Sequence, residues 1–172
     1  MAAKPRLTPD DWLRAGLDAL AREGAASLRA EALARALGAT KGSFYWHFTD
    51  VPAYQAQVLA AWSGQALDGF AALVDGPARP PAQLLRDLAR AMARPDASER
   101  AVRAWAVHDG QAARVLAEVD AARRATLDAL LAQLGVSNPD ISQFLQAATI
   151  GMAADAPGDP VGTLVDLVLA LR

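Results

Sequence analysis

The stretch Leu37–Phe48, with the sequence LGATKGSFYWHF, decides the fold. Phe44 and Phe48 lie four positions apart, so on a helix they share one face and anchor it to a core. Tyr45, Trp46 and His47 then point in other directions. An aromatic cluster at helical spacing is more often core than contact surface, but five consecutive bulky residues cannot all face one core. On geometry alone, both core packing and presentation to a partner remain open.

The residues before this stretch carry the signals of a helix, and alternating strand patterns are missing from the chain. Thr8, Pro9 and Asp11 predict the start of a first helix, with Thr8 as N-cap in a capping-box arrangement with Asp11. Gly24 marks its end. Ser27 is the expected N-cap of a second helix that runs to about Leu37.

The segment from 27 to 48 has the layout of a helix-turn-helix motif. Gly38 supplies a left-handed stop, and Thr40 caps a third helix of barely two turns. In such motifs the second helix enters the major groove of DNA. Gly42, which is unfavourable inside a helix, fits a position where the backbone approaches another surface closely.

The rest of the chain also predicts helices, so we expect an all-α fold. Thr49 and Asp50 are cap residues for a fourth helix that runs from Val51 to about Val74, before DGPARPP interrupts it. Asn138 and Asp159 each precede a proline, which is typical of helix starts. Five further helices are expected at 81–94, 97–108, 111–134, 139–154 and 160–171.

Composition restricts the class of protein. The chain has 172 residues, of which 53% are apolar, which is enough to bury a core. It has no cysteine, so disulfides, thiolate metal sites and thiol nucleophiles are excluded. The N-terminus lacks an apolar run of signal-peptide type, and no apolar stretch is long enough to span a bilayer. We therefore expect a soluble, cytoplasmic protein without a membrane partner.

Charge is divided unevenly along the chain. The net charge is −2, but residues 1–50 contain seven Lys or Arg and six Asp or Glu, against ten and thirteen in residues 51–172. The difference in net charge between the two parts is small. Its sign, with the N-terminal part more positive, is the one expected for an N-terminal surface that contacts a polyanion.

The sequence LARALGATKGSFYWHF resembles the DNA-binding signature of the TetR (tetracycline-repressor-like) family of bacterial transcription factors, from the leucine and alanine of the second helix to the Tyr-x-His-aromatic third helix. The resemblance implies an N-terminal helix-turn-helix DNA-binding domain (1–50), a helical regulatory and dimerisation domain (51–172) that binds a small-molecule effector, and a homodimer on a double-stranded DNA operator. By matching positions, it assigns DNA contacts to Arg29, Thr40, Lys41, Ser43, Tyr45, Trp46 and His47.

One position departs from the family pattern. Family members commonly carry a basic residue at the start of the fourth helix, where it grips a phosphate, whereas this chain has Asp50 and Val51. Phosphate contacts dominate DNA affinity, so this departure predicts weaker binding. Lys4, Arg6 and Arg14 are candidates to compensate.

A regulatory pocket is expected to be lined mainly by apolar and aromatic side chains. Each candidate is also a plausible core residue. His108 either orients a polar ligand or forms a hydrogen bond at a helix end. The candidate ligand-binding residues are Trp62, Phe70, Leu88, Met92, Trp105, His108 and Leu116.

The last predicted helix is apolar around most of its circumference, more than the stripe of about 100° that one core requires. We therefore expect burial on two sides, either in a four-helix dimer interface or deep in its own subunit. Small residues in the preceding helix would let another helix approach closely. The candidate interface residues are Ala147, Ala148, Gly151, Ala154, Leu164, Val168 and Leu171.

Together with the helix-turn-helix pattern, the resemblance to the TetR family implies a ligand-responsive DNA-binding repressor. The alternatives are a helical dimer with weak or lost DNA binding that acts through protein contacts, and a small-molecule enzyme. For an enzyme the chain is poorly equipped, because its two histidines, His47 and His108, are 61 positions apart and no nucleophile or phosphate-loop motif is present. We expect no cofactor and no metal.

Overall fold

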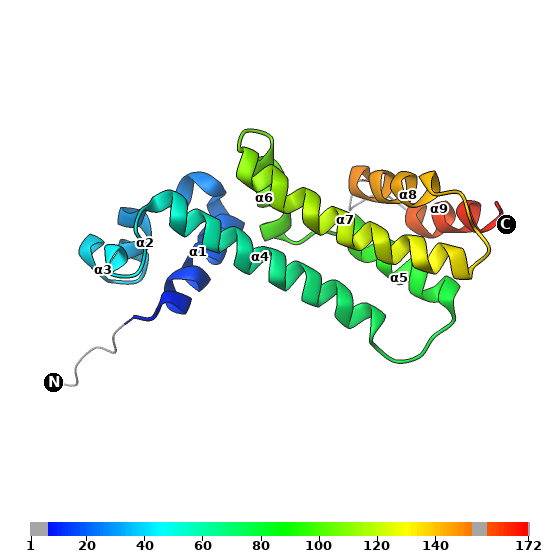
Figure 1. The fold of residues 1–172 in the computed structure, drawn as a ribbon, viewed down its shortest axis with the longest axis horizontal. Helices are drawn as coiled ribbons and strands as arrows, with labels where there is room; N and C mark the ends of the chain where they lie inside the picture. The colour runs from blue at the N-terminus through cyan, green and yellow to red at the C-terminus, as the bar shows by residue number, and fades with distance from the viewer. Residues whose placement is uncertain (1–6, 153–157, 172) are drawn as a thin grey trace. The chain divides into compact units, whose positions relative to one another are not determined.

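The regular secondary structure in the described part of the chain is all helical, which confirms the expected all-α fold. The structure, a computed structural model, describes residues 7–152 and 158–171. Within these residues, no helix is both long and apolar enough to cross a membrane. The elements (Figure 1) are α1 (Pro9–Glu23), η1 (Ala25–Ser27), α2 (Ala30–Ala36), α3 (Lys41–Tyr45), α4 (Val51–Val74), α5 (Pro81–Ala93), α6 (Ala97–Ala106), α7 (Gly110–Gln133), α8 (Asp140–Gly151) and α9 (Pro160–Leu169).

Most helix starts are where the cap residues predict them. Thr8 and Asp11 form a reciprocal capping box at the start of α1. The Thr40 hydroxyl accepts a hydrogen bond from the Ser43 backbone N–H at 3.2 Å, and an Asp50 carboxylate oxygen accepts one from the Ala53 N–H at 2.7 Å.

The prediction that Ser27 caps the second helix is wrong. Ser27 lies in the 3-10 turn η1, where its hydroxyl donates to the Gly24 carbonyl at 2.7 Å. The helix begins later, at Ala30, with Arg29 in the N-cap position and no side-chain cap. A serine hydroxyl that can bond backward to a nearby carbonyl is not committed to capping forward.

The helices cluster into two compact units. One contains the residues up to Gly64 together with Asp96–Leu116, and the other contains Gln65–Pro95 and the residues from Ala117 onward. Helices α4 and α7 contribute residues to both. The units are defined by packing, so the functional division between residues 50 and 51 stays a prediction.

An aromatic cluster forms the core of the first unit. The Phe44 ring lies 5.5 Å from that of Trp12 and 5.1 Å from that of Tyr54, both edge-on. The Tyr54 hydroxyl donates to the Trp12 carbonyl at 2.8 Å, and burial raises its pKa. Glycine at position 16 leaves room for the Tyr54 side chain from α4, because an added Cβ would lie 2.0 Å from the Tyr54 hydroxyl oxygen.

The second unit is built around α5, which contacts both α8 and α9 (Figure 1). Leu88, Leu127, Leu145 and Val165 are buried in its apolar core. Two ion pairs join α5 to α9 and the residue before it, Arg86 with Asp166 and Arg90 with Asp159. These contacts fix α9 against the core along one side.

Candidate nucleic-acid interface

The aromatic residues of helix α3 and of the turn that follows it are divided between the core and the surface. Phe44 and Phe48 are buried at 0% and 2% exposure, as their spacing predicts, whereas Tyr45 and Trp46 are 46% and 79% exposed. The Phe44 carbonyl accepts from the N–H of both His47 and Phe48, which closes the turn after the helix. The buried pair therefore holds the helix while its neighbours remain accessible.

The residues predicted to contact DNA lie within the first unit, at or beside α2 and α3. Ser43 and His47 are partly exposed, and the other five are exposed. A shallow depression of about 300 Å³ is lined by Thr40, Gly42, Ser43, Trp46 and His47. Four of the seven predicted contact residues thus share one concave surface.

Glycine at position 42 is not required by the chain's own fold. A Cβ added there would meet one neighbour, the Thr40 hydroxyl oxygen, at an ordinary contact distance of 3.7 Å. The residue is exposed in the first turn of α3, and its φ is not positive. Since glycine disfavours helix, the residue fits a surface that another molecule approaches closely.

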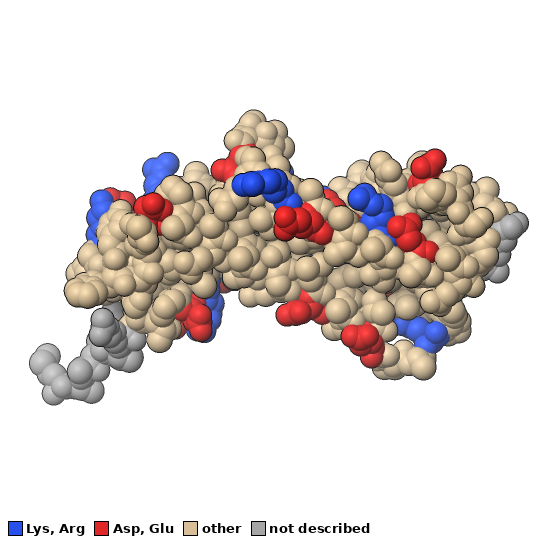
Figure 2. All heavy atoms as spheres, viewed as in Figure 1, with Lys and Arg blue, Asp and Glu red and all other residues tan. Residues whose placement is uncertain are grey.

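Lys41 is engaged with a carboxylate. Its ammonium group donates to Glu31, and this bond is the main reason that the pKa of Glu31 is lowered and that of Lys41 raised. Sequence patterns gave no sign of this pairing, because the two residues are ten positions apart. On the face drawn in Figure 2, basic and acidic side chains are interspersed and neither sign forms a continuous patch.

The start of α4 has no basic side chain. Val51 is its first residue, and the Asp50 carboxylate caps it. Arg14, one candidate to compensate, is exposed and lies 3.7 Å from Asp11. The other two candidates, Lys4 and Arg6, lie outside the described residues.

The predicted ligand-binding residues are distributed over both units. Phe70, Leu88 and Met92 belong to the core cluster of the second unit. Trp62 is buried in the first unit, to which three further candidates also belong. Of these three, Trp105 and Leu116 are partly buried and His108 is exposed.

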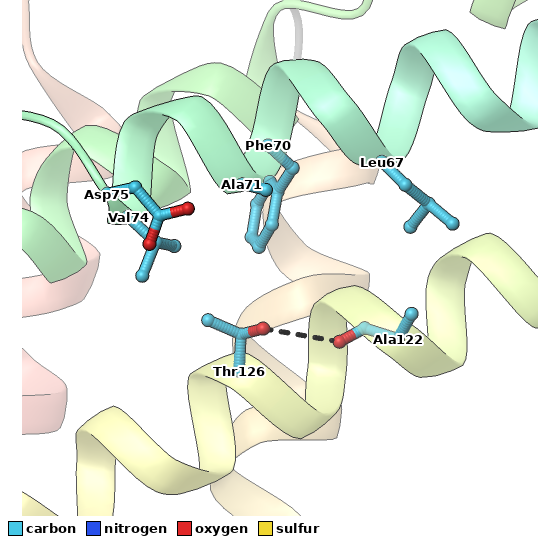
Figure 3. A pocket seen from close by; sticks show the side chains of 7 residues that line it. All are labelled: Leu67, Phe70, Ala71, Val74, Asp75, Ala122 and Thr126. Atoms are coloured by element: carbon cyan, nitrogen blue, oxygen red, sulfur yellow. Dashed lines mark hydrogen bonds between the residues drawn. The ribbon is translucent and has the colours of Figure 1, made fainter.

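Phe70 also lines a pocket of about 260 Å³ in the second unit. The lining side chains come from the end of α4, from Asp75 directly after it and from α7 (Figure 3). Sequence reasoning missed all of them except Phe70, although the 3–4-residue spacing along the end of α4 was a signal for a shared face. The pocket is lined by Leu67, Phe70, Ala71, Val74, Asp75, Ala122 and Thr126.

The predicted interface residues differ in their exposure. Leu164 and Val168 are buried in the chain's own core, whereas Ala147, Gly151 and Leu171 are exposed and Ala148 is partly buried. Ala154 lies outside the described residues. Two large apolar residues that the sequence did not single out, Phe144 and Leu167, are 58% and 64% exposed.

Comparisons with known proteins agree with this fold. Residues 13–50 match the family model described as "Bacterial regulatory proteins, tetR family". Among curated proteins, none matches significantly. At the identities below, the likeness to solved structures establishes the fold alone.

Three solved structures are similar over nearly the whole chain. A proposed TetR-family transcriptional regulator from Rhodococcus sp. has a TM-score of 0.76 at 18% identity, covering 94% of this chain and 98% of its own. A transcriptional regulator from Rhodococcus sp. Rha1 has a TM-score of 0.71 at 21% identity, covering 96% and 95%. GusR from Salmonella enterica has a TM-score of 0.70 at 20% identity, covering 97% and 98%.

Proposed function

Since residues 13–50 belong to the tetR family of bacterial regulatory proteins, we propose that the chain is a homodimeric transcription regulator that binds an operator in double-stranded DNA through α3. We propose further that it is a repressor, which a small-molecule effector releases from DNA. Regulation is favoured over catalysis because the family match and the similar structures concern regulators. We also propose a cytoplasmic location, which agrees with a DNA-binding role in a bacterial regulator.

The division of α3 carries this proposal. Phe44 is buried while Tyr45 and Trp46 are exposed, which supports a rigid helix whose outer edge enters the major groove. In that role Lys41 contacts phosphate, whereas Trp46 and His47 reach base edges, where an indole ring suits the thymine methyl group.

A second copy of the chain is needed for the proposed operator. Two recognition helices of a dimer bind half-sites about 34–36 Å apart on one side of the duplex. The exposed apolar residues Phe144, Leu167 and Leu171 on and beside α8 and α9 support an interface there. We expect Leu167→Asp to give a monomer with unchanged helical content, measured by sedimentation and circular dichroism. A dimer that survives this change would place the interface elsewhere.

The proposed release works through differential binding. An effector shifts the population only if it binds one arrangement of the recognition helices better than the other. Helix α4 is a single element that carries both Tyr54, a core residue of the first unit, and Phe70, which lines the pocket. We propose that ligand-induced changes in α4 alter the spacing of the two α3 helices.

Selection of bound fragments from random duplex DNA tests this function. The proposal predicts enrichment of an inverted repeat whose half-site centres are about 10–10.5 base pairs apart or a multiple of that spacing. Transcription from a promoter that overlaps the selected sequence should fall when the protein is added. No enrichment at low salt would contradict the proposal, and enhanced transcription would contradict repression.

A regulator with weak or lost DNA binding is the second candidate. Position 51, at the start of α4, holds Val51 instead of a basic residue, and the adjacent Asp50 is acidic. In addition, Lys41 is paired with Glu31. Both features favour this candidate. This candidate predicts a stable dimer that enriches no DNA sequence but is retained by a partner protein. The same selection therefore separates the two.

A further inference from the structure

The pocket in the second unit has apolar walls and two polar residues. Leu67 on α4 and Asp75 just after it mark the two ends of the pocket, with the Phe70 ring between them, and Ala122 and Thr126 face them from α7 (Figure 3). Its volume of about 260 Å³ is slightly below the range of roughly 300–1,000 Å³ that is typical of pockets for drug-sized ligands. A small ligand with an apolar body fits these dimensions.

Asp75 is the charged residue in this lining, and its position is unfavourable in the free chain. It directly follows Val74, the last residue of α4, and its N–H donates to the Ala71 carbonyl at 2.8 Å. A carboxylate at a helix C-terminus is opposed by the helix dipole. Among the described residues, its side chain has no hydrogen bond or ion pair. The nearest cation along the chain, Arg79, pairs with Asp87 at 2.9 Å instead.

Thr126 adds a second hydrogen-bond acceptor. Its hydroxyl donates to the Ala122 carbonyl of its own helix at 3.4 Å, as the dashed line in Figure 3 shows. Because that bond uses the hydroxyl proton, the oxygen offers lone pairs to a ligand. Both polar side chains of the pocket therefore present acceptors.

A basic residue near the pocket, Arg123, could attract an anionic ligand. Its guanidinium lies 5.6 Å from the centre of the Phe70 ring, and the residue is buried. It is not part of the pocket lining. An anionic ligand drawn to Arg123 is therefore the principal competing outcome.

We propose that this pocket binds a small organic cation, a primary or secondary ammonium group attached to an apolar body, with Asp75 as its counter-ion and Thr126 as a second acceptor. The apolar body lies against Phe70, Leu67 and Val74. Such a ligand neutralises a carboxylate that the helix dipole disfavours. Residues whose local placement is energetically unfavourable are often found at functional sites, and Asp75, an acidic residue at a helix C-terminus, is one such residue. That the ligand also releases DNA rests on the proposed function.

Three probes of nearly equal size test the ligand class without DNA. They are 2-phenylethylamine, 2-phenylethanol and phenylacetate, which carry a positive, no and a negative charge at neutral pH. Binding to the full-length protein is measured by calorimetry and by ligand-observed magnetic resonance. The proposal predicts that the amine binds most tightly and the carboxylate least. Equal binding, absence of binding or preference for phenylacetate would overturn it.

Two variants locate the site. Asp75→Asn should weaken binding of the amine roughly three- to five-fold, the range of an exposed ion pair, and leave 2-phenylethanol unchanged. Ala71→Phe should fill the pocket and remove binding of all probes. Both positions are exposed, so circular dichroism should be unchanged and neither variant should melt at a lower temperature. Asp75→Asn should melt slightly higher, because the helix dipole no longer opposes a carboxylate there. Equal loss of the amine and the alcohol in Asp75→Asn would contradict a counter-ion role.

The two proposals fail separately. If the amine binds as predicted but the chain selects no DNA sequence, the proposed function is wrong and the ligand class stands. If DNA is selected but the amine does not bind, the ligand class is wrong and the proposed function stands.

Discussion

The ammonium group of Lys41, the first residue of α3, is paired with the carboxylate of Glu31 in α2. Both side chains are more than half exposed, at 53% and 58%. If Lys41 grips phosphate, as we propose, the phosphate competes with Glu31 for the same cation. Glu31 then lowers DNA affinity for two reasons. It competes with phosphate for Lys41, and its negative charge repels the DNA.

Removing this carboxylate should strengthen DNA binding. Glu31→Gln is expected to raise the affinity for a selected duplex several-fold at low salt, whereas Lys41→Gln should lower it and reduce the slope of log affinity against log salt by about one. Fluorescence anisotropy over a salt series measures both quantities. Glu118→Gln, a change of the same charge at an exposed position of α7, is the matched control and should alter binding less. Equal effects of the two Glu variants would show that net charge alone is responsible.

Gly42 should favour DNA binding at the expense of the stability of the fold. Gly42→Ala is expected to stabilise the fold by up to about 1 kcal/mol, because alanine favours helix and the added Cβ meets no clash. The same methyl group should weaken DNA binding at least several-fold if the backbone approaches the duplex there. Urea unfolding and anisotropy on one preparation give the two values. Unchanged affinity would remove Gly42 from the interface.

Substitutions at Gly16 in α1 and Tyr54 in α4 should have strongly coupled effects on the free energy of unfolding. Gly16→Ala is expected to cost about 1–3 kcal/mol of unfolding free energy, because the new Cβ overlaps the Tyr54 hydroxyl. Tyr54→Phe removes the bond to the Trp12 carbonyl and should cost about 1 kcal/mol.

The double variant should cost less than the sum of the two, since the missing hydroxyl leaves room for the methyl group. Urea unfolding supplies the cycle. Gly64→Ala, in the interior of α4 with nothing within 4 Å of the added Cβ, is the control and should stabilise. Additive costs would mean that the two residues do not share this contact.

Acid should remove the stabilisation that Asp159 provides. The hydrogen bond from Arg90, at 2.6 Å, and that from the Gly162 N–H, at 3.0 Å, hold the pKa of Asp159 below its ordinary value of 3.8. Because the folded pKa is the lower one, the stabilisation is full above the unfolded value and is lost as the pH falls through the folded value. The stability difference between the wild type and Asp159→Asn should be constant near neutral pH and shrink below about pH 4. A difference that persists at pH 2 would point to packing instead of charge.

How far the sequence predicted the structure depends on the range of the interaction. Caps such as Thr8, Thr40 and Asp50 act within four residues, so their positions were predicted correctly. Ser27 failed because its hydroxyl has two local options, and sequence does not rank them.

Longer-range pairings were beyond local patterns. Lys41 and Glu31 lie on two helices that a turn separates. In the pocket, Phe70 and Thr126 line the same space although they are 56 positions apart in the sequence. The ligand candidates were chosen as large apolar residues, a property that core and pocket residues share. For the same reason Leu164 and Val168, chosen for an interface, lie in the chain's own core, while Leu167 is exposed.

The affinity of the Tyr45→Ala/His47→Ala variant for a selected duplex, compared with that of the wild type, tests the central claim most directly. Tyr45 is 46% exposed, although its ring packs edge-on against that of Phe44 at 5.2 Å, and His47 is partly exposed in the turn after α3. We predict a loss of at least about ten-fold, the equivalent of 1.4 kcal/mol. Helical content should be unchanged, and the melting temperature should fall only slightly, because the variant loses the Tyr45–Phe44 ring contact. Wild-type affinity in this variant, with its fold intact, would contradict the account that α3 reads DNA.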